Sequence, residues 1–363
     1  MRAGTICDLI PAMGYKLCFL FFAVAASTAA QWERVPVETT ASFRGLSVVD
    51  AKTVWASGTN GTVIRTVDGG ASWSVETVAG AEKLDFRGIK AFDGEHAVIV
   101  SSGDADAGQA RIYKTSDGGK TWNLVFEEKR KGVFFDALAF WDQRHGLVLS
   151  DPVDGKFALF GTEDGGASWK QIPAENIPPA LSQEGAFAAS NSCLTVSGHG
   201  NAWFGTGGAN AARVFHSADA GQTWSVSDTP LHPANASTGI FSLAFEDELR
   251  GVAVGGDYAH PAASPIPNVL FTTDGGKTWA GGAAKDAKAL YFSAVVYVGA
   301  GGNKGAKKEN RIFAAGSAGT RVLDPGNSWT VDSNLNFNAI AAFDADTLWA
   351  VGPKGAVWRR GIE

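Results

Sequence analysis

One octapeptide occurs five times in the chain, and this repeat constrains the fold more than any other feature. The first clear copies read TVDGGASW at 66–73 and TSDGGKTW at 115–122. Three further copies and a degenerate sixth follow, at 162–169, 217–224, 272–279 and 322–329. Their tryptophans are Trp73, Trp122, Trp169, Trp224, Trp279 and Trp329, spaced by 49, 47, 55, 55 and 50 residues. A spacing of this size is typical of one four-stranded propeller blade with its loops.

Short apolar runs between the octapeptides predict the strands of each blade. A unit begins with an aromatic-led run, such as FRGLSVV from Phe43 or FRGIKAF from Phe86. A second run ends in small residues, as VWASG does at 54–58, and a third, such as TVIRT at 62–66, leads into the octapeptide. Such runs, rich in Val, Ile and Phe and broken by Gly, Asp and Asn, are typical of β-strands. No window has convincing helical periodicity, so we expect an all-β chain.

The repeats predict a closed ring. Second and third strands occur in seven units, but the seventh unit, which begins near Phe337, reaches the end of the sequence without a fourth strand. QWERVPV at 31–37 precedes the first unit and contains Trp32 where a blade-ending tryptophan belongs. We therefore expect a single seven-bladed β-propeller over 31–363, closed by the N-terminal strand, which leaves only short sheet edges.

Residues 1–30 are predicted to be a signal peptide. The apolar run Leu17–Ala26 follows Lys16, and small residues precede Gln31. The run is short for a bilayer span, so we expect cleavage near residue 30 and a periplasmic or secreted protein that does not itself span the membrane. Cys7 and Cys18 are not in a lipoprotein-type context, and Cys193 would remain as a single thiol. A net charge of −6 argues against nucleic-acid binding.

The octapeptide itself is best explained as a hairpin turn. We expect its aspartates to accept hydrogen bonds from backbone amides a residue or two further on, its glycines to adopt positive φ, and its tryptophan to pack on neighbouring strands. The aspartates are Asp68, Asp117, Asp164, Asp219 and Asp274. GGKT at 118–121 and 275–278 lacks the preceding glycine of a phosphate-binding loop, so no nucleotide cofactor is expected.

A binding site is expected on the face opposite the octapeptides. The residues that follow the leading aromatic, or take the equivalent place, at the start of each innermost strand are Arg44, Arg87, Asp136, Ala188, Phe241, Ser293 and Asn338. Blades seven, one, two and three are consecutive, so Asn338, Arg44, Arg87 and Asp136 should meet at the channel mouth. The two arginines could hold a carboxylate, a phosphate or an acidic protein loop. Alternatively, they pair with Asp136 and nearby acids as internal scaffolding.

The same face should carry loops of unequal length, and long loops on a rigid scaffold favour recognition. Blade three contributes Asp151 and Asp154, and blade five contributes Asp257, Tyr258 and His260. Asp104 and Asp106 of blade two could bind calcium, but no further oxygen ligands can be named. The histidines show no metal-ligand spacing, so no metal is predicted.

The octapeptide pattern S/T-x-D-x-G-x-S/T-W resembles the Asp-box, or bacterial neuraminidase repeat. Within that superfamily the chain is similar to the photosystem II stability and assembly factor family, on FRG at 43–45 and 86–88 and on WASG and WAVG at 55–58 and 349–352. This resemblance implies a non-catalytic propeller on the lumenal or periplasmic side that binds a partly assembled membrane-protein subunit through an arginine patch. Arg44 and Arg87 are the positions that match. We also expect a monomer, because a closed ring leaves only short sheet edges.

A sialidase-like or other glycoside hydrolase is the alternative function. Phe43–Leu46 reads FRGL, which is similar to the FRIP start of sialidases. A sialidase, however, needs three arginines around a carboxylate and a tyrosine nucleophile. The alignment supplies only two channel arginines, and Tyr258 is the one tyrosine expected on that face. The sequence therefore favours a protein-binding scaffold over an enzyme.

Overall fold

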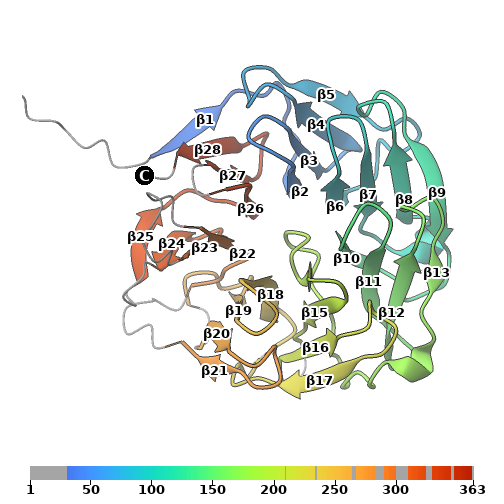
Figure 1. Ribbon diagram of the computed structural model, residues 1–363, viewed down its shortest axis with the longest axis vertical. Helices are drawn as coiled ribbons and strands as arrows, with labels where there is room; N and C mark the ends of the chain where they lie inside the picture. The colour runs from blue at the N-terminus through green and yellow to red at the C-terminus, as the bar shows by residue number, and fades with distance from the viewer. Residues whose placement is uncertain are drawn as a thin grey trace, which may run out of the picture.

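The computed structural model describes residues 31–208, 210–233, 235–263, 267–282, 290–299, 310–323, 329–344 and 347–361. The predicted signal peptide, the middle of the sixth octapeptide copy at 324–328 and the blade-six loop at 300–309 lie outside these residues. Strands of the described part form seven four-stranded antiparallel sheets, arranged as the blades of a ring (Figure 1). The all-β seven-bladed propeller predicted from the repeats is confirmed.

Each of the first three blades runs from the channel outward. Blade one contains β2 (Phe43–Val48), β3 (Val54–Gly58), β4 (Thr62–Thr66) and β5 (Ser74–Thr77). Blade two contains β6 (Phe86–Ala91), β7 (Ala97–Ser101), β8 (Ala110–Thr115) and β9 (Asn123–Glu128). Blade three contains β10 (Phe135–Phe140), β11 (Gly146–Val153), β12 (Lys156–Thr162) and β13 (Lys170–Gln171).

Blades four to six repeat this order. Blade four contains β14 (Leu194–Ser197), β15 (Asn201–Gly205), β16 (Arg213–Ser217) and β17 (Ser225–Asp228). Blade five contains β18 (Thr238–Phe245), β19 (Gly251–Asp257), β20 (Val269–Thr272) and β21 (Ala280–Gly281). Blade six contains β22 (Ala294–Val298), β23 (Arg311–Gly316), β24 (Gly319–Leu323) and β25 (Trp329–Ser333).

Blade seven is shared between the two ends of the chain. It contains β26 (Ala339–Ala342), β27 (Thr347–Val351) and β28 (Val357–Gly361), and its outer strand is β1 (Trp32–Val35). β1 pairs antiparallel with β28, in a register that places Trp32 opposite Arg360 and Val35 opposite Val357. Figure 1 shows β1 beside β28 at the edge of the ring. The predicted closure by the N-terminal strand is confirmed.

Helical structure is minor in the described residues. It consists of two 3-10 turns, η1 (Ala105–Ala107) and η2 (Ala174–Asn176). Neither turn approaches the length or hydrophobicity that crossing a bilayer demands, and the rest of the described chain offers no longer helix.

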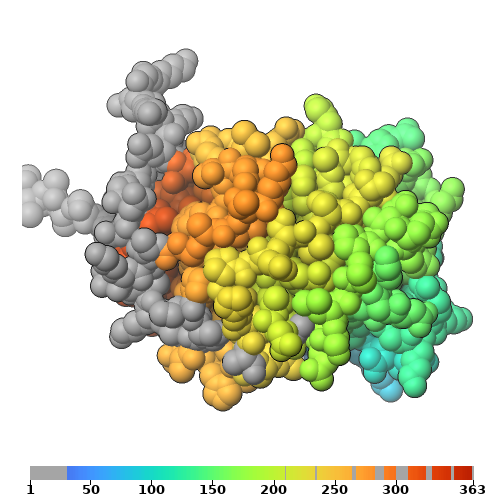
Figure 2. Space-filling view, turned by 90° about the horizontal axis from the view of Figure 1, so that it is seen from below, coloured from blue at the N-terminus to red at the C-terminus, as the bar shows by residue number. Residues whose placement is uncertain are grey.

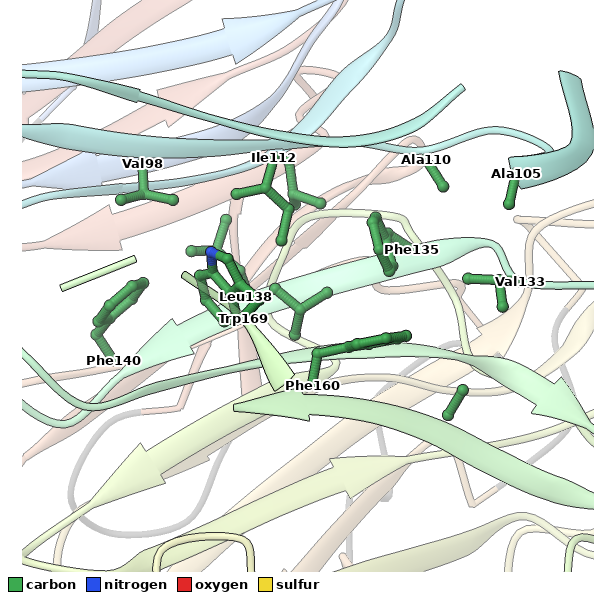
Figure 3. Packing of buried hydrophobic residues seen from close by; sticks show 13 residues of the cluster. Val98, Ala105, Ala110, Ile112, Val133, Phe135, Leu138, Phe140, Phe160 and Trp169 are labelled. Carbon is green, nitrogen blue, oxygen red and sulfur yellow. The ribbon is translucent and has the colours of Figure 1, made fainter. Parts of the chain in front are cut away.

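The core lies between adjacent blades, because each sheet buries both of its faces against its neighbours. The cluster in Figure 3 joins Val98 and Ile112 of blade two to Phe135, Phe160 and Trp169 of blade three. Similar clusters fill the other blade interfaces. Figure 2, turned by 90°, shows blades three to five in green to orange as one continuous outer wall. The blades therefore hold the channel-facing residues on a rigid frame.

The octapeptides form turns between third and fourth strands, and their geometry differs from the expected one in a single respect. In blade two, the Asp117 carboxylate accepts hydrogen bonds from the backbone amide of Thr121 at 3.0 Å and its hydroxyl at 2.6 Å. The amide is therefore four residues further on, not one or two. The Thr115 hydroxyl donates to the Asp117 carboxylate from the other side of the turn, at 2.9 Å.

Glycine is required at the tip of this turn. Gly119 has φ 84°, and a Cβ there would lie 3.2 Å from the Trp55 ring of blade one. The Trp122 ring packs edge-on against the same Trp55, with centroids 6.3 Å apart. The octapeptide thus joins neighbouring blades, as expected from its tryptophan.

Candidate functional site

A β-bulge recurs at the start of the innermost strand in four blades. The pairing with the second strand shifts between Phe43 and Gly45, and at the equivalent places of blades two, three and five. The residues that the shifts leave unpaired are Arg44, Arg87, Asp136 and Phe241. A bulge re-aims the extra side chain, and all four side chains line one cavity of about 490 Å³ at the channel mouth.

The glycine of the FRG motif has a packing role beside the bulge. A Cβ on Gly88 would meet the side chains of Val100 at 2.5 Å and Asn191 at 2.6 Å. The motif is therefore explained by an arginine that bulges into the channel, followed by a residue with no room for a side chain.

Most of the residues predicted for the site line this cavity. Its lining includes Arg44, Arg87, Asp136, Asp151, Tyr258 and Asn338. It lies among the loops between second and third strands, on the face opposite the octapeptide turns. Asn338, Arg44, Arg87 and Asp136, from blades seven, one, two and three, therefore line one cavity, as expected.

Two predicted residues, Asp154 and Asp257, lie outside this cavity. Asp154 is exposed in the tight turn between β11 and β12, with φ 52°. Asp257 is buried at the end of β19 and accepts hydrogen bonds from Ser237 at 2.5 Å and Asn235 at 3.1 Å. His260 Nδ1 also lies 3.0 Å from its carboxylate. These contacts shape the blade-five loop that carries Tyr258.

A segment before blade four crosses the channel, and the alignment of the repeats misplaced it. The alignment puts Ala188 at the start of the innermost strand of blade four, but that strand is β14, which begins at Leu194. Residues 186–193 instead run across the ring. The Ser190 hydroxyl donates to the carbonyl of Ser293 in blade six at 2.6 Å, and Asn191 accepts from the amide of Leu138 in blade three at 2.8 Å.

Both arginines donate hydrogen bonds to backbone carbonyls of this segment, residues 186–193. Arg44 donates to the carbonyl of Ala189 at 3.1 Å, and Arg87 donates to that of Ala188 at 3.4 Å. Arg87 also forms an ion pair with Asp85 at 2.7 Å. Arg87 thus pairs with a nearby acid, as the scaffolding interpretation expected. Neither arginine pairs with Asp136, and within the described part of the chain no carboxylate accepts a hydrogen bond from Arg44.

Arg44 is the more available of the two arginines. A guanidinium has five N–H donors, and a single hydrogen bond from Arg44 to the described residues is present. Burial, and then the charge of Arg87, lower the pKa of the Arg44 guanidinium. The charge of Asp85 acts in the opposite direction, but no described carboxylate accepts a hydrogen bond from Arg44. The remaining N–H donors of Arg44 are therefore open to a carboxylate ligand.

Two carboxyl groups of blade three, Asp136 and Asp151, line the cavity next to Arg87 of blade two. Asp136 is buried, with 1% of its surface exposed, and burial and then Asp151 raise its pKa well above the ordinary value. Burial also raises the pKa of Asp151 to about 6, against the effect of the hydrogen bond from the Ala186 amide. The cavity thus has a cationic and an acidic side.

Aromatic rings complete the wall, and sequence reasoning missed several of them. Phe187 stacks on Phe241 with centroids 3.9 Å apart, and Tyr291 meets Phe241 edge-on at 4.9 Å. Phe134 also lines the cavity. Tyr291, which lies directly before the leading aromatic of blade six, could have been found by reading one position earlier. Tyr258 is therefore accompanied by a second tyrosine, contrary to expectation.

The described lining holds no third arginine that could complete a sialidase-type carboxylate site. Nor do the described residues contain a group of three His, Cys, Asp or Glu side chains suited to a metal ion. The chemistry that these residues offer is the binding of a charged, partly apolar ligand.

Comparisons with known proteins agree with this architecture. A sequence model of the family described as "Photosynthesis system II assembly factor YCF48" matches residues 24–132. The chain is 26% identical over 341 residues to "Photosystem II assembly lipoprotein Ycf48" of Picosynechococcus sp. (strain ATCC 27264 / PCC 7002 / PR-6), covering 90% of this chain and 87% of that protein.

Solved structures show the same fold. "YCF48 from Cyanidioschyzon merolae" superposes with a TM-score of 0.64 at 16% identity, covering 91% of this chain and 98% of that one. "YCF48 bound to D1 peptide" superposes with a TM-score of 0.61 at 19% identity, covering 93% and 98%. The chain is therefore a seven-bladed Asp-box propeller similar to the photosystem II stability and assembly factors.

Proposed function

We propose that this propeller is a non-catalytic scaffold that binds a protein partner, a membrane-protein subunit or an assembly intermediate, through the channel mouth. The observation that carries the proposal is the position of Arg44 and Arg87. Two consecutive blades present them at one cavity through the same bulge, and Arg44 retains donors without an anionic partner in the described structure. An acidic side chain or a free C-terminal carboxylate of the partner is the complementary ligand.

The comparisons support a protein partner. One of the similar structures is YCF48 bound to D1 peptide, so a propeller of this shape holds a peptide in that case. The cavity here, about 490 Å³ with aromatic rings beside charged groups, has the size and character for one or two side chains of such a segment.

The proposal includes export. The apolar run Leu17–Ala26 and the small residues before Gln31 favour a cleaved leader and a periplasmic or secreted location. The similar cyanobacterial protein is named a lipoprotein, and a location outside the cytoplasm agrees with that name. Edman sequencing of the protein purified from its host tests the predicted cleavage near residue 30.

A pull-down from solubilised host membranes tests the partner. Wild-type protein should recover a partner that the Arg44→Glu/Arg87→Glu double variant loses. The matched control is Arg144→Glu/Arg250→Glu, which reverses two exposed arginines in loops between first and second strands, on the opposite face. Recovery of the same partner by wild type and by the channel variant would contradict the proposal.

A further inference from the structure

The acidic side of the cavity has an unused hydrogen-bond acceptor. Asp136 bulges from β10 next to the pair Phe135–Ser150, and Asp151 follows Ser150 in β11, so the two carboxyl groups are neighbours on one hairpin. Asp136 Oδ2 has no hydrogen-bond partner among the described residues, although Asp136 is 1% exposed. Asp151 Oδ1 accepts from the Ala186 amide at 2.9 Å, and both residues line the cavity.

No cation of the described chain forms an ion pair with these two acids. Arg87 is near enough to lower the pKa of Asp136, but its ion pair is with Asp85. Buried polar groups are otherwise almost always satisfied, and a buried carboxyl group without a donor is costly. An uncharged side chain at position 136 would pack in this place equally well. The acid pair is therefore better explained by a ligand than by packing.

A primary ammonium group fits this pair better than a metal ion does. A calcium ion takes six to eight oxygen ligands, and the described residues contain no cluster of three His, Cys, Asp or Glu side chains. An ammonium needs three acceptors at most. The rings of Phe134, Phe187 and Tyr258 line the same cavity, and aromatic faces attract cations as well.

We propose that Asp136 and Asp151 form a subsite for a primary ammonium group, so that the cavity receives a partner segment bearing both an ammonium and a carboxylate. The ammonium belongs to a lysine side chain or an amino terminus, and the carboxylate lies against Arg44. This inference adds the chemistry of the bound segment to the proposed function. The contact between its carboxylate and Arg44 depends on that proposed function, whereas the ammonium subsite does not.

Calorimetric titration of the full chain with three small probes tests the two halves separately. ε-Aminocaproate carries both charges, caproate only the carboxylate, and hexylamine only the ammonium. For the wild-type protein we expect ε-aminocaproate to bind about tenfold more tightly than caproate, the effect of one added charged hydrogen-bonded contact. Asp136→Asn and Asp151→Asn should each remove this gain, whereas Asp154→Asn, in an exposed turn outside the cavity, should preserve it.

The pH dependence gives a second readout. Binding an ammonium displaces protons from the acid pair, so the affinity for hexylamine should rise as pH increases through about 6, the pKa of Asp151. Asp151→Asn should reduce this rise. An affinity for hexylamine that is independent of pH and unaffected by either substitution would overturn the subsite.

The remaining outcomes separate this inference from the proposed function. Equal affinities for caproate and ε-aminocaproate, with caproate binding lost in Arg44→Glu, would overturn the ammonium subsite and leave the arginine site standing. Hexylamine binding that Asp136→Asn abolishes, with caproate binding unaffected by Arg44→Glu, would support the subsite and contradict the carboxylate site. Failure of all three probes to bind would overturn both.

Discussion

The Trp32 indole donates a hydrogen bond of 2.6 Å to the Asp332 carboxylate, which is 300 positions further along the chain. The same ring lies 4.6 Å from that of Phe337. Asp332 also forms an ion pair with Arg360 at 2.9 Å. One residue of β1 therefore connects blades six and seven, and closure of the ring depends on contacts between the two ends of the chain.

Trp32→Ala should therefore destabilise the whole ring. We expect a loss of about 2–4 kcal/mol in the free energy of unfolding, as for other packed aromatic residues truncated to alanine. Urea titration followed by tryptophan fluorescence and circular dichroism measures this loss. Phe343→Ala is the control, because Phe343 is 49% exposed and its truncation should change stability by less than about 0.5 kcal/mol. Equal effects of the two substitutions would contradict the closure argument.

The octapeptide aspartates should make the protein sensitive to acid. Hydrogen bonds from Ser or Thr hydroxyls and amides lower the pKa of Asp68, Asp117 and Asp274 to about 2, and similar bonds outweigh burial to lower that of Asp164 to about 2. For a carboxyl group with a depressed folded-state pKa, the stabilisation is present above the unfolded value, about 3.8, and is lost as pH falls through the folded value.

Melting temperature should therefore drop steeply between about pH 4 and pH 2, the window set by these pKa values. Replacing the octapeptide aspartates by asparagine one at a time should make this drop shallower with each step, while lowering the melting temperature at neutral pH. A pH profile that is the same in wild type and in the multiple variant would show that these turns do not determine acid stability.

The sequence was sufficient to predict the blade count, the closing strand and the meeting of Arg44, Arg87, Asp136 and Asn338 at one cavity, because equivalent positions of the repeats have similar surroundings. The bulges that point three of these side chains into the channel were not predicted. The sequence was insufficient for residues 186–193. The alignment matched Phe187 with the leading aromatics of other blades, although this segment forms no strand. Its path is set by hydrogen bonds to blades one, two, three and six, and such distant partners leave no periodic pattern in the segment itself.

Arg44 and Arg87 should contribute unequally to partner binding. Arg87 is held by Asp85 at 2.7 Å, whereas Arg44 has no carboxylate partner in the described structure. Arg44→Ala should weaken binding of an acidic peptide by about tenfold or more, as expected for loss of a charged hydrogen-bonded pair. Arg87→Ala should weaken it less. Fluorescence anisotropy with a labelled peptide at two salt concentrations measures both affinities, and a larger effect of Arg87→Ala would contradict this ranking.

Asp136→Asn should stabilise the protein, most strongly at alkaline pH. Burial and then Asp151 raise the pKa of Asp136, so the folded state holds a proton that the unfolded state has released above about pH 4. The wild-type protein consequently loses stability as pH rises from the unfolded value toward the raised folded one. An asparagine side chain would keep the shape of the aspartate without a charge to bury, so the variant should gain about 1–3 kcal/mol at pH 8 and less at pH 5. Thermal unfolding at both pH values measures this gain in stability, and Asp154→Asn is the exposed control. If Asp136→Asn is less stable than wild type at pH 8, Asp136 is a structural acid and not an unused hydrogen-bond acceptor.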